Sequence, residues 1–254
     1  MKSTKFYKGF SINKDRDRTK GKIRSSADRH QKDTDIHEQT FHKFRSYGDS
    51  ILRSPCIQKS SPCVIKKISK KRDHIYGDPE AELSIIEYLD FECLFCKEYN
   101  LIPKKLVHRF GGKLNWVSRH FPALYRNPGA LIKAEASECA NELGGLTAFW
   151  KYSEQIFSYN KTNKKVIPRN ELVPLAYKIG LDGQKFKLFL DNGTFQFRIL
   201  EDLTEGAKIG IFRTPSSFIL NNITGEFILK IGPASLDELM DDIRILKTES
   251  RSSE

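Results

Sequence analysis

The chain has 254 residues, of which 39% are hydrophobic and 30% are charged, and it carries a formal net charge of +11. This length provides for one large domain or two small ones with a real core, and no apolar run is long enough to span a bilayer, so a transmembrane protein is not expected. Five cysteines leave one unpaired in any bonding pattern, which argues against a disulfide-framework protein.

The first 70 residues form a distinct basic segment. They hold 18 basic and 7 acidic side chains, which account for the whole net charge, while the rest of the chain holds 25 of each sign. With little apolar surface to offset chain entropy, residues 1–70 are predicted to be a disordered arm. Contact with nucleic acid or an acidic membrane through Lys20, Lys22, Arg24 and Arg29 is the alternative to a merely solvated charge run.

Two further features of this segment concern compartment and cysteines. Residues 1–10 are basic but reach no apolar core of a secretory signal, so the chain as written is expected in the cytoplasm. Cys56 and Cys63 have three open interpretations: a mutual disulfide, metal ligands, or ordinary thiols.

The folded domain is predicted over residues 71–248, after a turn-rich lead-in at residues 73–80. Residues 83–91 are rich in β-branched and aromatic side chains and predict a buried strand. A helix is expected from Cys93, ended by Gly111 and Gly112, and a second strand at residues 114–121. Strand, helix and strand within about 40 residues predict a parallel βαβ unit.

Cys93 and Cys96 lie where the first strand gives way to this helix. At that place the first sulfur is close to unpaired backbone N–H groups and to the positive end of the helix dipole, which favours thiolate. Cys93 is therefore the predicted attacking thiol. Cys96, one turn further in, is the predicted resolving thiol, which closes a Cys93–Cys96 disulfide.

The remaining chain predicts a helical insertion at about residues 128–210, followed by a hairpin and a last helix. Helices are expected at residues 130–143, 147–159, 171–179, 184–190 and 195–208. Strands at residues 216–220 and 226–231 are separated by a five-residue turn that contains Gly225. Ser235 and Glu238 form a capping box that opens the final helix.

Five motifs accompany this order of elements: Asp90-Phe91-Glu92-Cys93-Leu94-Phe95-Cys96, Arg119-His120-Phe121-Pro122, Glu138-Cys139-Ala140, Ile179-Gly180-Leu181-Asp182 and Gly210-Ile211-Phe212-Arg213-Thr214-Pro215-Ser216. Together with the order of elements, they resemble the DsbA-like branch of the thioredoxin superfamily over about residues 74–246. The resemblance implies an α/β, thioredoxin-like fold with an inserted helical subdomain, preceded here by the basic arm. It also implies thiol–disulfide oxidoreductase activity on proteins.

Carried onto this sequence, the family pattern makes Cys93 the nucleophile, Cys96 the resolving thiol and Thr214-Pro215 a cis peptide bond beside them. A cis proline lacks an N–H and leaves the neighbouring backbone open for pairing with a substrate peptide. Glu87 matches a buried acid beneath the resolving cysteine, where it would take the Cys96 proton. On an alternating strand it would instead face solvent.

Other motif residues are interpreted as structural. Arg119 and His120 are expected to form a satisfied turn after the second strand, and Cys139 is expected to be a small core residue.

The chain departs from the family pattern in two places beside the cysteines. Leu94 and Phe95 stand between Cys93 and Cys96, where the family often has proline or histidine, so thiolate stabilisation is expected from the helix end alone. Arg213 precedes Thr214-Pro215, where glycine is frequent. Its charge would lower the Cys93 pKa, select an acidic substrate, or simply be solvated.

The predicted function is disulfide exchange with protein or peptide substrates, regenerated by an unidentified redox partner, without metal or organic cofactor. If the start of the chain or its export route is misjudged, the family favours the periplasm or another exported compartment. One alternative is a catalytically inactive binding module of the same fold. Another is a structural zinc site formed by Cys56, Cys63, Cys93 and Cys96.

Overall fold

The computed structural model describes residues 65–124, 127 and 129–249. The predictions for residues 1–64, including Cys56 and Cys63, lie outside this range. None of the described helices combines the length and the apolar character that a membrane crossing requires.

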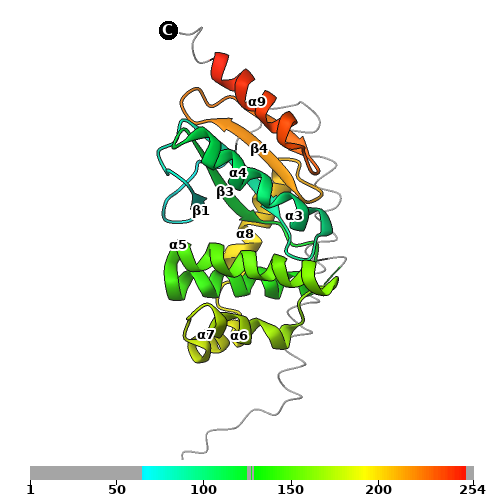
Figure 1. The fold of residues 1–254 in the computed structure, drawn as a ribbon. Helices are drawn as coiled ribbons and strands as arrows, with labels where there is room; N and C mark the ends of the chain where they lie inside the picture. Colours follow the sequence, from blue (N-terminus) through cyan, green and yellow to red (C-terminus); the bar gives the residue numbers. More distant parts are fainter. Residues whose placement is uncertain (1–64, 125–126, 128, 250–254) are drawn as a thin grey trace, which may run out of the picture. The chain divides into compact units, whose positions relative to one another are not determined.

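A five-stranded mixed sheet organises the described part of the chain, in the order β1-β3-β2-β4-β5 (Figure 1). β2 and β3 are parallel, and the other neighbours are antiparallel. The strands are β1 His74–Tyr76, β2 Leu83–Leu89, β3 Leu114–His120, β4 Ser216–Asn221 and β5 Phe227–Ile231. The parallel βαβ unit and the C-terminal hairpin are therefore confirmed, and β1 is an additional edge strand inside the segment expected to be a turn-rich lead-in.

Eight helices cover the sheet and form the insertion among the described residues. They are α3 Leu94–Tyr99, α4 Leu101–Phe110, α5 Gly129–Asn163, α6 Arg169–Lys178, α7 Gly183–Asp191, α8 Gln196–Lys208 and α9 Leu236–Glu249, with α5 counted as two because a kink divides it. The kink lies at Gly145, whose φ of 66° and ψ of −167° are not helical. The capping box is present, because Ser235 N–H donates to Glu238 Oε2 at 2.7 Å and Glu238 N–H donates to Ser235 Oγ at 3.2 Å.

Alternation along β2 sends side chains to two different cores. Leu83 and Ile85 pack with α4 and α9 on one face, whereas Ile86 and Tyr88 pack with α8 on the other. Residues of the basic segment also reach the second face, since Ile65 and Ile68 pack against it. The sheet is thus covered on both sides, as its mostly apolar strands require.

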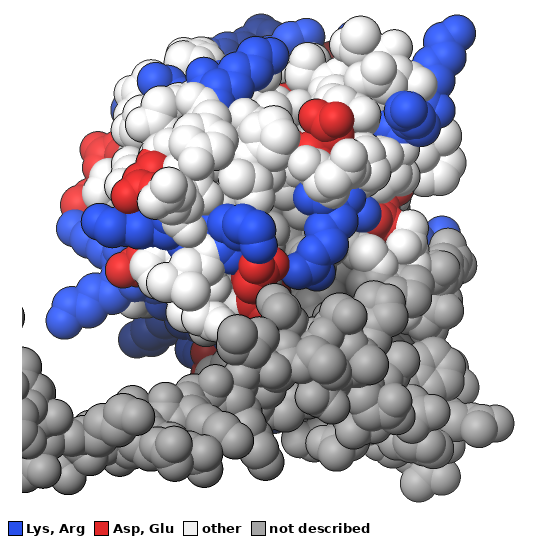
Figure 2. Space-filling model, turned by 90° about the horizontal axis from the view of Figure 1, so that it is seen from below, with Lys and Arg blue, Asp and Glu red and all other residues white. Residues whose placement is uncertain are grey.

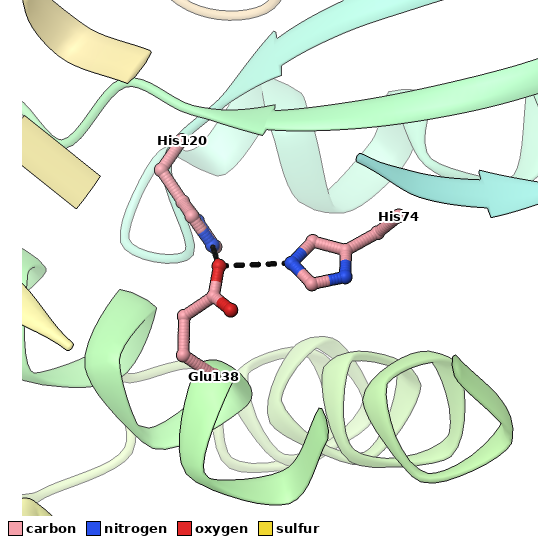
Figure 3. A group of neighbouring side chains, drawn as sticks. All are labelled: His74, His120 and Glu138. Atoms are coloured by element: carbon pink, nitrogen blue, oxygen red, sulfur yellow. Dashed lines mark hydrogen bonds and ion pairs between the residues drawn. The ribbon is translucent and has the colours of Figure 1, made fainter. Parts of the chain in front are cut away.

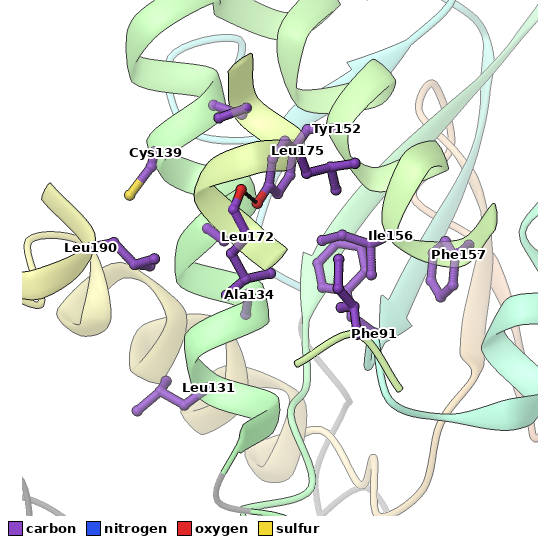
Figure 4. Packing of buried hydrophobic residues seen from close by; sticks show 14 of the residues in the cluster. Phe91, Leu131, Ala134, Cys139, Tyr152, Ile156, Phe157, Leu172, Leu175 and Leu190 are labelled. Atoms are coloured by element: carbon purple, nitrogen blue, oxygen red, sulfur yellow. Dashed lines mark hydrogen bonds between the residues drawn. The ribbon is translucent and has the colours of Figure 1, made fainter. Parts of the chain in front are cut away.

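The insertion has a core of its own, in which α5 lies between the sheet and the α6–α7 pair (Figures 1 and 4). The rings of Tyr152 and Phe186 are tilted by 43° with their centroids 5.3 Å apart, and the Tyr152 hydroxyl donates to the Leu172 carbonyl at 2.7 Å. Phe91, from the loop between β2 and α3, and Cys96, from α3, belong to the same cluster. The insertion therefore packs directly behind the cysteine motif. Cys139 is buried in this core as well.

Charge on the described part is dispersed. On the face seen in Figure 2, Lys and Arg side chains are interspersed with Asp and Glu side chains. Arg169 and Lys187 on α6 and α7 both pair with Asp191. This arrangement agrees with the balanced charge of the sequence after residue 70.

Candidate active site

Cys93 and Cys96 lie at the junction between β2 and α3. Cys93 is the N-cap residue of α3, with φ −74° and ψ 123°, and its side chain is half-buried. Cys96 lies one turn into the helix and is fully buried. One sulfur is thus open to a reaction partner and the other is shielded behind it.

The segment 213–215, far away in sequence, meets Cys93 at this junction. The Thr214-Pro215 peptide bond is cis. The Cys93 thiol donates to the Thr214 carbonyl oxygen, with 3.3 Å between Sγ and O. Beside this contact, Arg213 is exposed and its guanidinium lies 4.8 Å from the centroid of the Phe212 ring.

The surroundings of Cys93 favour its thiolate. A hydrogen bond from the Cys96 thiol is the main cause that lowers the pKa of Cys93, to about 6 from its ordinary value of 9.0. A side-chain hydrogen bond from Thr214 and the backbone N–H groups of Cys96 and Phe95 add to it, while partial burial opposes it. The helix end therefore acts together with Cys96 and Thr214, and not alone as the sequence suggested.

Cys96 and Glu87 share the buried side of the site. Burial is the main reason that the pKa of Cys96 is raised well above its ordinary value, with Cys93 and Glu87 adding to the effect. Burial also raises the pKa of Glu87 to about 8, against a hydrogen bond from Trp116 Nε1 to Glu87 Oε2 of 2.9 Å. Glu87 Oε1 is buried and has no hydrogen-bond partner among the described residues. Glu87 faces the interior and not solvent, so one proton acceptor remains unused there.

The loop that leads to Cys93 is held by Asp90. Its Oδ1 accepts the Glu92 N–H at 2.8 Å, its Oδ2 accepts the Ala123 N–H at 2.9 Å, and its carbonyl accepts the Cys93 N–H at 3.1 Å. The neighbouring Glu92 pairs with Lys133 of α5. These contacts fix the backbone around the sulfur and tie it to the insertion.

The comparisons with known proteins identify the family of this fold. The profile of the family described as Thioredoxin matches residues 69–242, more than half of the chain. DsbA2 from Pseudomonas aeruginosa is 30% identical in its crystal structure, with a TM-score of 0.60, and the match covers 71% of this chain and 97% of that chain.

The chain belongs to the DsbA-like branch of the thioredoxin superfamily.

Other solved structures share this DsbA-like fold at lower identity. Wolbachia pipientis α-DsbA1 is 23% identical with a TM-score of 0.59, covering 73% of this chain and 96% of that chain. BdbD from Bacillus subtilis is 22% identical with a TM-score of 0.57, covering 73% and 98%.

Curated relatives match the same DsbA-like domain. The protein named Na(+)/H(+) antiporter NhaA from Herminiimonas arsenicoxydans is 33% identical over 159 residues, which is 62% of this chain. The match covers 24% of that relative, so this chain spans about a quarter of its length.

The DsbA-like domain also contains a buried His–Glu–His cluster formed by His74, His120 and Glu138 (Figure 3). Each imidazole Nε2 lies 2.8 Å from the same Glu138 Oε1. Burial alone would raise the pKa of Glu138, but the two histidines outweigh it and hold that pKa well below its ordinary value. The cluster joins β1, the end of β3 and α5.

Two histidines and one glutamate are also a ligand set for zinc. However, the 2.8 Å separations are those of hydrogen bonds, and the Arg198 Nε lies 3.7 Å from the same Oε1. A divalent cation at this position would face a guanidinium, which is unfavourable in a buried site. The residues fit a hydrogen-bonded structural centre better than a metal centre.

Arg119 lies beside this cluster on β3. Its Nε donates to Asp73 Oδ1 at 2.9 Å, its Nη1 to the Tyr88 hydroxyl at 3.2 Å, and its Nη2 to the Lys66 carbonyl at 2.9 Å. The interpretation of Arg119 and His120 as a turn is wrong, because both are buried strand residues. The signal available in the sequence was a charged and an ionisable side chain within the predicted strand 114–121, since such groups need partners when they are buried.

Proposed function

We propose that this DsbA-like protein is a thiol–disulfide oxidoreductase that exchanges disulfides with protein substrates through Cys93 and Cys96. The observation that carries the proposal is the contrast between the two sulfurs. Cys93 is half-buried and has a pKa of about 6, while Cys96 is fully buried and has a strongly raised pKa. At neutral pH the Cys93 thiol is ionised and accessible, and the Cys96 thiol is protonated and shielded.

In the reducing direction the Cys93 thiolate attacks one sulfur of a substrate disulfide. The substrate S–S bond breaks, the other substrate sulfur leaves as a thiolate, and a mixed disulfide joins Cys93 to the substrate. Cys96 then loses its proton and attacks the Cys93 sulfur, which releases the second substrate sulfur and forms the Cys93–Cys96 disulfide. The substrate gains two electrons that the protein dithiol gives up, and the reverse sequence oxidises a substrate dithiol.

Glu87 is proposed as the acceptor of the Cys96 proton. Its carboxyl is buried, one oxygen is unpartnered among the described residues, and it influences the pKa of Cys96. A carboxyl with a pKa of about 8 is mostly protonated at neutral pH, and its ionised fraction is a stronger base than an ordinary carboxylate. We expect Glu87→Gln to slow the step in which Cys96 releases the substrate, by about 10²-fold, without slowing the attack by Cys93.

Thr214 and Pro215 are proposed as the binding site for the substrate backbone. The Thr214 carbonyl lies 3.3 Å from Cys93 Sγ, so a peptide joined to that sulfur passes next to residues 213–215. An extended peptide can add its backbone hydrogen bonds there. Protein or peptide thiols are the substrate class that this arrangement favours, with a second redox partner needed to restore the starting state.

A redox titration tests this function. The protein is equilibrated with a series of glutathione ratios, and the fraction of Cys93–Cys96 disulfide is read by thiol alkylation and mass. A single two-electron transition is expected, and its midpoint sets the direction of exchange and the compartment, cytoplasmic or exported, in which it runs. Reduction of insulin by dithiothreitol should be accelerated by the wild type and not by Cys93→Ser; equal rates would contradict the proposal.

A further inference from the structure

Large apolar side chains are exposed around the reacting sulfur. Leu94 and Phe95, which follow Cys93 directly, are 57% and 55% exposed, and Phe212 on the opposing segment is 42% exposed. Because these side chains are only partly covered by the fold, they offer apolar contact area to a peptide.

Arg213 adds one positive charge to this apolar surface. Its guanidinium lies over the Phe212 ring at 4.8 Å, and no carboxylate of the described residues is within ion-pairing distance of it. Arg119 and Arg198, by contrast, each pair with an aspartate. Stacking on an aromatic ring orients a guanidinium and leaves its N–H groups free for a carboxylate.

The backbone of Arg213 is next to the residue that contacts the reacting sulfur. Arg213 directly precedes Thr214, whose carbonyl is 3.3 Å from Cys93 Sγ. An extended chain advances about 3.3 Å per residue. When the cysteine of an extended peptide is bonded to Cys93, only the peptide residues next to that cysteine are therefore within reach of Arg213.

We propose that the selecting surface formed by Leu94, Phe95, Phe212 and Arg213 favours extended peptides in which the reacting cysteine has apolar neighbours and a carboxylate within two residues. This inference rests on the proposed exchange activity and names the substrate class of the same site. The apolar side chains contact the peptide, and the Arg213 guanidinium pairs with its Asp or Glu.

The test measures only the first step of exchange, in the Cys96→Ser protein. Each short peptide has one cysteine, which is joined by a disulfide to the neutral thiol 2-mercaptoethanol. Glu, Gln or Lys is placed in turn at each of the two positions on either side of this cysteine. Second-order rate constants for the Glu and Gln peptides are measured with the proteins that carry Arg213 and Arg213→Gln, which together form a double-mutant cycle. The effect that Glu has on the reactivity of the peptide's own sulfur cancels in this comparison. We expect the Glu-to-Gln rate ratio to be about two- to five-fold higher with Arg213 present than in the Arg213→Gln protein, and to fall at high salt.

Lys113→Gln is the matched control, because it removes the same charge at the opposite end of the sheet. Lys113 is exposed and precedes β3, whose far end, His120, lies beside the active-site loop. This variant should keep the wild-type ratio, and Phe212→Ala should reduce both the preference for Glu and the preference for Leu over Ser beside the cysteine.

Equal ratios in the Arg213 and Arg213→Gln proteins, with normal rates for the Gln peptides, would overturn the inference alone. An equal loss in Lys113→Gln would also overturn it, because a general charge effect would then explain the preference. If no peptide reacts with Cys93 at all, the proposed function fails and this inference fails with it.

Discussion

Replacing Glu87 by glutamine tests the electrostatics of the site through protein stability. The folded state holds the Glu87 proton up to a pKa of about 8, whereas the unfolded chain releases it near the ordinary value of 4.5. At this group the unfolded state therefore binds fewer protons between these values, and the contribution of Glu87 to wild-type stability falls as pH rises through this window. Burial is the main physical cause, and the charge on Cys93 adds to it.

The size of the effect follows from the two pKa values. One pKa unit corresponds to about 1.4 kcal/mol. Ionisation of Glu87 in the unfolded chain therefore lowers the free energy of unfolding by about 3 kcal/mol at neutral pH and by almost nothing near pH 4. Glutamine has nearly the same shape, and its side-chain oxygen can accept the Trp116 N–H in place of Glu87 Oε2. The free energy of unfolding of Glu87→Gln, minus that of wild type, should therefore rise by about 3 kcal/mol from pH 4 to pH 7.

Urea unfolding of the reduced proteins, followed by tryptophan fluorescence across this pH range, measures the difference. Glu98→Gln on α3 is the control, since that carboxyl is exposed and its difference from wild type should not follow the Glu87 curve. A Glu87→Gln difference that stays constant with pH would refute the assignment of a raised pKa and, with it, the proposed proton acceptor.

Three further outcomes are expected. The ultraviolet absorbance of the Cys93 thiolate should titrate with a midpoint near pH 6, and in Cys96→Ala the midpoint should rise because the main hydrogen bond to that thiolate is lost; a wild-type midpoint near 9 would contradict the structure. Glu138→Gln should lower the free energy of unfolding by about 3 kcal/mol in urea, because the two imidazoles lose their charged acceptor; an unchanged midpoint would show that the cluster contributes no stability. Gly145→Ala should cost about 1–2 kcal/mol in the same assay, because its φ of 66° strains a residue with a Cβ; a neutral effect would mean that the kink can relax.

Elements with strong local patterns were predictable from the sequence. The apolar run of β2, the capping box at Ser235 and the helical periodicities of the insertion all depend on neighbours a few residues apart. β1 was missed because three residues among turn formers carry no periodicity, and its pairing with β3 is long-range. The break at Asn100, which divides one expected helix into α3 and α4, keeps helical dihedrals; its sequence signals, Asn100 at the N-cap and Pro103 in the first turn of α4, were not used.

The candidate site divides in the same way. The positions of Cys93 and Cys96 at a strand end follow from local pattern, and the family resemblance supplied Glu87 and Pro215. The His–Glu–His cluster was missed because its members come from three elements, with His74 and Glu138 separated by 64 residues. No local spacing reports such a contact. The part that Cys96 plays in lowering the pKa of Cys93 likewise depends on the packing of side chains and not on their order.

Trapping of the mixed disulfide tests the central claim most directly. Cys96→Ser and Cys93→Ser proteins are incubated with a disulfide-bonded peptide, quenched by alkylation and analysed by mass. The account predicts a covalent one-to-one adduct at Cys93 in Cys96→Ser and none in Cys93→Ser. An adduct at Cys96, or equal trapping in both variants, would contradict the assignment of Cys93 as the attacking thiol.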